Sequence, residues 1–284
     1  MTSKVSQKLN DIINKNHIDG MVYLNSWLVK RGISPSMIYY YRKKKLIQSI
    51  GDEYPFKYGV TLPKNERLLH SGVFTKFNEI PDYYGGVQAL QKQLELNVHV
   101  AADHALMLQK VIPNLINWKK EKVLFAPKGV MLPKWFFEAP WYSNVLFKST
   151  TFLPQDIGIE QTGKYQLLTS RPERAILELI YLIPNNMHMR YIHECIKKLT
   201  NIDIDLMHEL LENCTSNRVK RLFLYLIEEE NLSWLEKLKV GNLDLGKGTI
   251  VIEKPGKHNS KYKIVVSDFS NDIDYKQKFR GIPL

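Results

Sequence analysis

The most chemically distinctive stretch of this sequence is a run of hydroxyl, aromatic and basic side chains between residues 36 and 45. It reads Ser-Met-Ile-Tyr-Tyr-Tyr-Arg-Lys-Lys-Lys and ends in four consecutive positive charges, Arg42 to Lys45. Guanidinium and ammonium groups bind phosphates, whereas hydroxyls and rings beside them suit contact with base edges in a groove. These residue types therefore indicate recognition of a nucleic acid.

The residues around this run predict a helix–turn–helix. Asn25 is expected to cap a first short helix, and Gly32 stands where that helix ends and the chain turns. Ser34 is expected to cap the second helix, with Pro35 at its first position, where a missing N–H costs nothing. Such a pair of helices places the second one in the DNA major groove.

The spacing of side chains divides the second helix into a buried face and an exposed face. The buried face is expected to hold Met37, Ile38 and Tyr41. The exposed face, directed at the major groove, is expected to hold Ser36, Tyr39, Tyr40 and Lys43. Phosphate contacts are expected from Arg42, Lys44, Lys45, Lys30 and Arg31. A solvated basic face of a helix pair that never touches DNA is the alternative.

Strand-like runs after the second helix favour a winged domain over residues 1–96. Residues 46–50 and 72–77 are expected to pair antiparallel, with 51–71 as an enlarged wing and 82–95 as a closing helix. Residues 1–50 hold nine Lys and Arg against Asp11 and Asp19, which gives +7 of the chain's net charge of +11. This concentration of charge supports an anionic partner for the first domain.

Residues 97–267 change to a mixed α/β pattern, and 268–284 read as a charged tail. We expect a mixed sheet of four or five strands, then a capping box from Ser170 to Glu173 that starts an apolar helix. Three more helices, at 187–199, 203–213 and 216–230, form a bundle-like portion, and 249–253 with 262–266 form a terminal hairpin. The fold class is therefore α+β. Lys220 and Arg221 are candidates for an acidic or anionic partner, or for a solvated helix face.

The sequence offers little for catalysis, metals or cofactors. It contains no phosphate-binding Gly-x-x-x-x-Gly-Lys-Ser/Thr loop and no His-Glu-x-x-His pair. Asp203 and Asp205 form an Asp-x-Asp pair, but their place at a helix start favours a capping role. We predict no enzyme activity, no cofactor and no metal site. A DNA-processing nuclease that uses these two acids is the weaker alternative.

The sequence also indicates the cellular compartment of the protein. No apolar run reaches the roughly 20 residues that span a bilayer, and the first residues lack the apolar core of a signal peptide. The two cysteines, Cys195 and Cys214, give no disulfide framework. A cytoplasmic protein without a membrane partner is expected.

Short segments in a specific order, spread over nearly the whole chain, carry a family resemblance. In the first domain they are Ser26-Trp-Leu, Gly32-Ile-Ser, Tyr41-Arg-Lys, Leu46-Ile-Gln-Ser-Ile-Gly51 and Gln88-Ala-Leu-Gln-Lys-Gln-Leu94, and Val98-His-Val-Ala101 follows directly after that domain. In the second they are Leu132-Pro-Lys-Trp135, Ser170-Arg-Pro-Glu-Arg-Ala-Ile-Leu-Glu-Leu179, Val219-Lys-Arg-Leu-Phe-Leu-Tyr225, Asp244-Leu-Gly and Lys261-Tyr-Lys-Ile264. Together they resemble the AbiEi antitoxins of type IV (AbiE) toxin–antitoxin systems. The insertion at 51–71 departs from that pattern.

The resemblance implies a bacterial antitoxin and autorepressor that takes part in phage defence. Its winged helix-turn-helix would bind double-stranded DNA at inverted repeats in its own promoter. Its C-terminal domain would counteract an AbiEii-like nucleotidyltransferase toxin without the need for a stable complex. A stand-alone transcriptional regulator with an α/β effector domain is the alternative.

Overall fold

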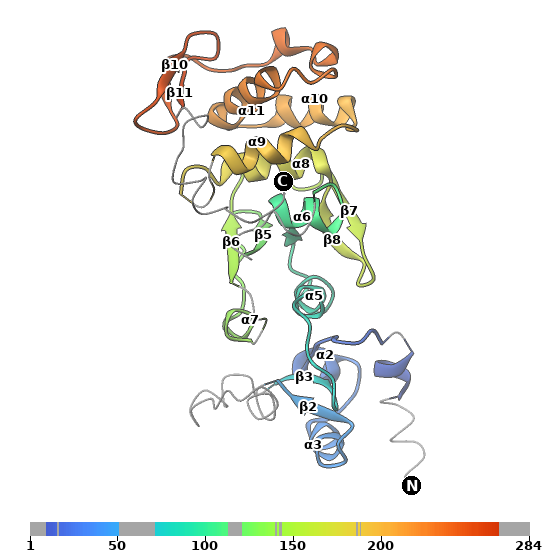
Figure 1. Cartoon of the computed structure of the whole chain (residues 1–284). Coiled ribbons are helices and arrows are strands. Elements are labelled where there is room, and N and C mark those ends of the chain that lie inside the picture. The colour runs from blue at the N-terminus through green and yellow to red at the C-terminus, as the bar shows by residue number, and fades with distance from the viewer. Residues whose placement is uncertain are drawn as a thin grey trace, which may run out of the picture. The chain divides into compact units, whose positions relative to one another are not determined.

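The computed structural model describes residues 10–15, 17–50, 72–112, 121–139, 141, 144–185, 187 and 189–266. The chain contains both helices and strands and forms two compact units (Figure 1). The first unit comprises residues 1–98, 129–145 and 161–168, and the second comprises 99–128, 146–160 and 169–284. The predicted α+β class is confirmed. The predicted insertion at 51–71 and tail at 268–284 lie outside the described residues.

A helix pair and a small antiparallel sheet begin the first unit. Its elements are the π-helical turn η1 (Asn10–Asn14), β1 (Tyr23–Leu24), α2 (Asn25–Lys30), α3 (Pro35–Lys43), β2 (Ile47–Ser49) and β3 (Val73–Lys76). The sheet order is β1-β3-β2, and Gln48 of β2 lies opposite Thr75 of β3. The predicted antiparallel pairing of the two strands is thus confirmed, and β1 adds a third.

The two helices of this pair begin differently. The Ser34 side chain accepts a hydrogen bond from the N–H of Met37 (3.3 Å), as the sequence predicted. The predicted cap at Asn25 is wrong, because Leu24 occupies the N-cap position and Asn25 is already helical. The chain passes directly from β1 into α2 at Leu24. The N–H of Leu24 donates to the side-chain oxygen of Gln93 (2.8 Å).

The predicted closing helix consists of α5 (Tyr83–Gln88) and a π-helical turn, η2 (Ala89–Gln93). Asp82 caps it by accepting from the N–H of Tyr84 (3.2 Å). Two adjacent glycines lie on its closely packed side. A Cβ on Gly85 would lie 2.1 Å from the carbonyl oxygen of Gly20, and one on Gly86 would lie 2.7 Å from the Trp141 ring. Glycine is needed at both positions, because only a residue without a Cβ lets Gly20 and Trp141 pack this closely against the helix. The short helix α7 (Lys134–Glu138) completes the first unit.

A mixed five-stranded sheet lies mainly in the second unit. Its strands are β4 (His99–Val100), β5 (Lys122–Ala126), β6 (Val145–Ser149), β7 (Ile159–Thr162) and β8 (Leu167–Ser170), in the order β6-β5-β4-β8-β7. β4 pairs antiparallel with β5 and parallel with β8. The predicted mixed sheet is confirmed.

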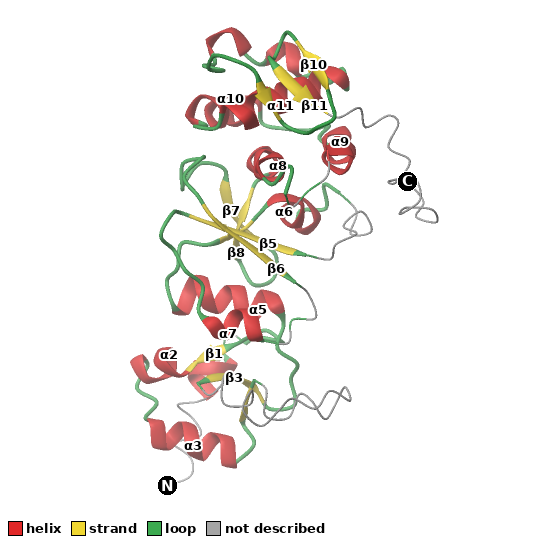
Figure 2. Ribbon diagram, turned by 90° about the vertical axis from the view of Figure 1, so that its left-hand side faces the viewer, coloured by secondary structure: helices red, strands yellow, loops and turns green. Residues whose placement is uncertain are grey.

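The remaining helices of the second unit surround α8 (Pro172–Tyr181). They are α6 (Ala102–Leu108), α9 (Met189–Lys197), α10 (Ile204–Asn213) and α11 (Asn217–Glu229), and each contacts α8 (Figure 2). Eight consecutive residues of α8, from Glu173 to Ile180, are buried. The apolar run that predicted this helix therefore forms the centre of the unit. No helix within the described ranges is long and apolar enough to cross a membrane.

The predicted capping box at the start of α8 is wrong. Arg171 is the N-cap residue and makes no side-chain capping bond. The hydroxyl of Ser170 donates to Glu178 (2.7 Å), and Glu173 accepts from the N–H of Asp203 (2.7 Å). Both side chains thus serve contacts with residues distant in sequence rather than the local backbone.

The predicted terminal hairpin is also wrong in its pairing. Two 3₁₀ turns, η4 (Leu235–Lys237) and η5 (Val240–Asn242), precede a sheet of β9 (Ile250–Val251), β10 (Lys257–Asn259) and β11 (Ile264–Val266). β9 runs parallel to β11, and β10 pairs antiparallel with it. Because β10 occupies one edge of β11, β9 is left with the other edge.

Candidate nucleic-acid interface

The helix α3 separates its apolar and polar side chains as the spacing predicted. Ile38 and Tyr41 are buried, and Met37 is half-buried. On the opposite side Ser36 is exposed, and the rings of Tyr39 and Tyr40 are 58% and 40% exposed. Two large aromatic side chains left in water at one helix face are available for a partner.

The four basic residues at the end of α3 are all exposed. The ammonium of Lys43 lies 5.0 Å from the ring centre of Tyr39, and that of Lys44 lies 5.8 Å from that of Tyr40. In each pair the lysine follows the tyrosine by four residues, about one helical turn, and the cation–π contact holds the two side chains together. The helix ends at Lys43, and two residues later Lys45 adopts a left-handed backbone conformation with φ of 54°. That turn directs the chain from α3 into β2.

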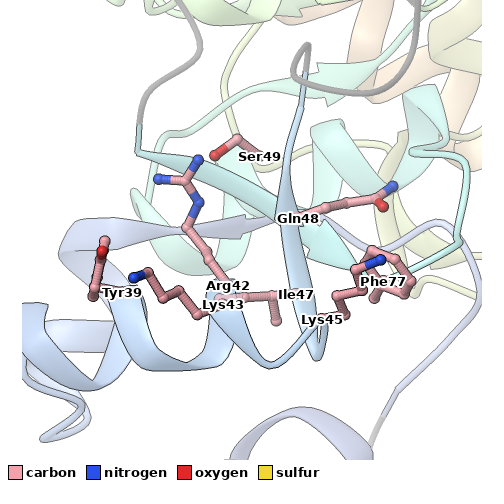
Figure 3. Close-up of a pocket in the computed structure, with 8 residues that line it drawn as sticks. All are labelled: Tyr39, Arg42, Lys43, Lys45, Ile47, Gln48, Ser49 and Phe77. Atoms are coloured by element: carbon pink, nitrogen blue, oxygen red, sulfur yellow. The ribbon is translucent and has the colours of Figure 1, made fainter. Parts of the chain in front are cut away.

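A pocket of about 300 Å³ lies between α3 and the sheet of the first unit. Its lining residues are Tyr39, Arg42, Lys43, Lys45, Ile47, Gln48, Ser49 and Phe77. Figure 3 shows the guanidinium of Arg42 directed toward Ser49 on β2, with the ammonium of Lys45 beside the Phe77 ring. Among the described residues that line this concavity, three are cations and none is acidic, so their charge favours an anion such as a phosphate.

One lining residue, Gln48, fixes the base of the sheet next to the pocket. Its amide nitrogen donates to the carbonyl of Glu79 (3.1 Å), and its amide oxygen accepts from the N–H of Asn78 (3.2 Å). The turn after β3 is therefore anchored to β2 through one side chain. This turn places Phe77 in the pocket wall.

The pocket includes four of the nine residues proposed from the sequence, namely Tyr39, Arg42, Lys43 and Lys45. Ser36, Tyr40 and Lys44 lie on exposed parts of the same segment but do not line the pocket. Lys30 and Arg31 are exposed at the end of α2, where the Arg31 guanidinium stacks on Trp27 at 4.0 Å. Gln48, Ser49 and Phe77 were not proposed, and only the alternation within β2 and β3 could have indicated them.

The basic pair of α11 does not face a partner, which corrects one of the sequence-based proposals. Lys220 and Arg221 are buried, at 4% and 1% exposure. The Arg221 guanidinium donates to the carbonyls of Leu245 (2.6 Å), Gly248 (2.6 Å) and Lys263 (3.2 Å). Arg221 thus ties α11 to the C-terminal sheet, and its charge is used within the unit.

Asp203, the first of the two acids considered for a nuclease, has a structural role. One oxygen of Asp203 caps α10 by accepting from the N–H of Leu206 (3.1 Å), and the other accepts from Arg171 (3.4 Å). Asp205 lies exposed in the first turn of the same helix. Capping, which the sequence favoured, is confirmed.

A buried ionic cluster organises the second unit around Glu178. Its carboxylate bonds to His99 (2.7 Å), Arg174 (2.7 Å), Ser170 (2.7 Å) and the N–H of Ala102 (3.2 Å). Burial alone would raise the pKa of Glu178, but the charges of His99 and Arg174 lower it to about 2. The cluster links β4, β8, α6 and α8 and lies inside the unit, where it serves stability.

A second buried acid, Asp103, has a raised pKa, whereas that of Glu178 is lowered. Burial raises the pKa of Asp103 to about 6, although the hydroxyl of Tyr191 donates to it at 2.9 Å and lowers the pKa in part. Within the described part of the chain, no positive charge is paired with its carboxylate in the way that Arg174 is paired with Glu178. The two acids therefore differ in their expected effect on stability as pH changes.

Comparison with protein families gives two adjacent matches. Residues 64–116 match a family described as "Transcriptional regulator, AbiEi antitoxin N-terminal domain". Residues 119–267 match "Transcriptional regulator, AbiEi antitoxin, Type IV TA system". The helix pair α2–α3 lies ahead of both matched ranges.

Comparison with solved structures gives a similar fold in the RV2827C protein from Mycobacterium tuberculosis. The TM-score is 0.50 at 10% sequence identity, over 87% of this chain and 93% of that one. At this identity the likeness concerns the fold alone. No curated protein matches the chain.

Proposed function

The chain belongs to the AbiEi family of type IV antitoxins and transcriptional regulators, and from this premise we propose that it represses its own operon and counteracts the operon's toxin. In this proposal the first unit binds double-stranded DNA as a winged helix-turn-helix. The second unit carries the antitoxin activity, with no enzymatic reaction of its own.

The observation that carries the DNA-binding part is the exposed face of α3 next to the cationic pocket. α3 is capped by Ser34 and held by its buried Ile38 and Tyr41, so it presents Tyr39 and Tyr40 on a rigid support. Ser36, Tyr39, Tyr40 and Lys43 are proposed to meet base edges in the major groove. Arg42 and Lys45, together with Lys44, Lys30 and Arg31, are proposed to bind the phosphates on either side.

The pocket supports this assignment by its shape and its charge. A phosphate group in the pocket would lie between the end of α3 and strands β2 and β3, the elements that border a groove when a winged helix docks. Arg42 is the strongest candidate for this contact, because its planar guanidinium can donate two parallel hydrogen bonds to a phosphate.

The antitoxin part rests on the family assignment, since the larger family match covers residues 119–267. We propose that the partner is a nucleotidyltransferase-like toxin encoded beside this gene. The alternative of a stand-alone regulator would have the same DNA-binding unit but no toxin to oppose. A nuclease is less well supported, because Asp203 of its Asp-x-Asp pair caps α10.

A growth assay tests the proposal directly. The neighbouring gene is expressed alone, with the full-length chain, or with a full-length chain in which Arg42, Lys43 and Lys45 are replaced by glutamine. We expect the toxin to arrest growth and both versions of this chain to restore it. The variant should no longer repress a reporter placed behind the operon's promoter. A harmless neighbour, or failure of the unaltered chain to restore growth, contradicts the antitoxin part.

A further inference from the structure

A histidine and two carboxylates meet beside the sheet of the first unit. His17 and Asp19 lie in the segment before β1, and Glu79 lies three residues after β3. Each offers a ligand atom, and these atoms all lie within 4.8 Å of one another. The His17 side chain is 7% exposed and that of Glu79 is 18% exposed, so the centre of the cluster is largely shielded from water.

The hydrogen bonds around His17 determine which of its nitrogens faces the carboxylates. The hydroxyl of Tyr23 donates to the carbonyl of Ile13 (3.4 Å), and its oxygen lies 2.7 Å from His17 Nδ1. The contact with Nδ1 is the shorter of the two, and it orients the imidazole so that Nε2 is turned toward the carboxylates, whichever of the two atoms carries the hydrogen.

The other ring nitrogen of His17 then faces negative charge. Nε2 lies 2.7 Å and 2.8 Å from the two oxygens of Glu79, and 3.8 Å from an oxygen of Asp19. In the tautomer with hydrogen on Nδ1, Nε2 offers its lone pair to a metal ion, which would take the place of the hydrogen that otherwise lies between Nε2 and Glu79.

We propose that His17, Asp19 and Glu79 bind a Zn²⁺ ion, with His17 Nε2 and one oxygen from each carboxylate as ligands. Three protein ligands leave a fourth tetrahedral position for water. The mixed set of one imidazole and two carboxylates suits Zn²⁺, whereas Mg²⁺ favours octahedral coordination by oxygen and retains several waters.

The adjustments needed for binding are small and fall on side chains that can move. Bonds of about 2.1 Å in a tetrahedron separate neighbouring ligand atoms by about 3.4 Å, so Glu79 must retreat from His17 by well under 1 Å. Asp19 is 94% exposed and can turn toward the ion. Lys76, whose ammonium lies 3.7 Å from Glu79, competes for the carboxylate, but it is 40% exposed and can move into solvent.

Two further contacts already hold the ligands in the orientation that a metal requires. Tyr23 fixes the ring of His17 through Nδ1, and the N–H of Gly20 donates to an oxygen of Glu79 (3.3 Å). Hydrogen bonds of this kind orient metal ligands and raise their affinity. None of the three ligands lines the cationic pocket, although Gln48, which does line it, donates to the backbone carbonyl of Glu79.

The test is calorimetric titration of the full-length, metal-free chain with ZnCl₂, followed by Co²⁺ as a visible-absorbing substitute. Asp19→Asn is the informative variant, because it removes a ligand from an exposed position and leaves the His17–Glu79 contact in place. Asp156→Asn, at an exposed position of the second unit, is the matched control.

We expect one Zn²⁺ per chain in the wild type and in Asp156→Asn, with binding weakened about tenfold or more in Asp19→Asn. His17→Gln and Glu79→Gln should abolish the site and the Co²⁺ absorption together. Absence of stoichiometric binding in the wild type would overturn the proposal. Equal affinity of the wild type and Asp19→Asn would overturn it as well, since the ion would then be bound elsewhere.

Discussion

Replacing two cations of the pocket should change how DNA binding depends on salt. The double variant Arg42→Gln/Lys45→Gln removes two charges that line the concavity between α3 and the sheet of the first unit. Both side chains are exposed, so the substitutions leave the core untouched. If each side chain neutralises one phosphate, each loss reduces the slope of log K against log salt by about 0.9.

The size of the effect follows from that slope. Two lost contacts reduce it by about 1.8, and a rise in salt from about 50 mM to about 200 mM is fourfold. The wild type should therefore lose about tenfold more affinity than the double variant over this range. The difference should be the same for promoter DNA and for unrelated DNA, because phosphate contacts carry no sequence information.

Fluorescence anisotropy with labelled promoter fragments at several salt concentrations measures both slopes. The matched control is Lys128→Gln/Lys198→Gln, which changes the net charge equally at exposed positions of the second unit. We expect the control to keep the wild-type slope. The assignment is refuted if the Arg42/Lys45 variant keeps that slope, or if the control loses as much as it does.

Three stability predictions follow from the packing and the buried acids. Glu178→Gln should lower the free energy of unfolding at pH 7 by about 3–5 kcal/mol, because it leaves the buried guanidinium of Arg174 without its counter-charge. That difference should be present above about pH 4.5 and shrink as the pH falls toward about 2, since the folded-state pKa of Glu178 is lowered. For Asp103 the pKa is raised to about 6, so the charged carboxylate is unfavourable in the folded state. Asp103→Asn should therefore gain stability relative to the wild type as the pH rises through 6. Gly85→Ala should destabilise by about 1–3 kcal/mol, because its Cβ would overlap the backbone of Gly20.

Urea unfolding at several pH values measures all three. Gly241→Ala is the control for the glycine substitution, because nothing lies within 4 Å of a Cβ at that position. A pH-independent difference for Glu178→Gln would show that its carboxylate is not held ionised by its neighbours. If Asp103→Asn is less stable than the wild type at alkaline pH, the charge argument is contradicted. If Gly85→Ala leaves the free energy of unfolding unchanged, the packing argument is contradicted.

Local features of the sequence identified the starts of two helices and the buried face of one of them. Ser34 followed by Pro35 identified the start of α3, and Asp203 identified the start of α10, because a cap bonds to the backbone two or three residues away. The spacing of Ile38 and Tyr41 likewise identified the buried face of α3, since helical periodicity is a property of the segment itself.

Part of the candidate interface also followed from the sequence. The basic run from Arg42 to Lys45 is contiguous and lies beyond the buried positions of its helix, so its exposure was predictable. The pocket that three of its cations line was not predictable. It depends on β2 and β3 bringing Gln48, Ser49 and Phe77 beside the end of α3, and residues 48 and 77 are far apart along the chain.

Tertiary structure alone decided the roles of several polar residues. Arg221 was as consistent with a solvated face as with a partner, yet it donates to three carbonyls of the C-terminal segment. Ser170 had the sequence context of a helix cap, yet it bonds to Glu178 within the buried cluster. Polar side chains bond to whichever group burial leaves without water, and that group often lies distant in sequence.

The same reason explains the last sheet and the proposed metal site. Strand periodicity predicted residues 249–253 and 262–266 as strands, but pairing depends on which edge is free, and β10 takes one edge of β11. His17 and Glu79 are 62 residues apart, and only the fold brings them to 2.7 Å. The sequence by itself therefore determined the segments and the family, whereas the contacts between distant segments decided which polar groups are structural and which remain available to bind.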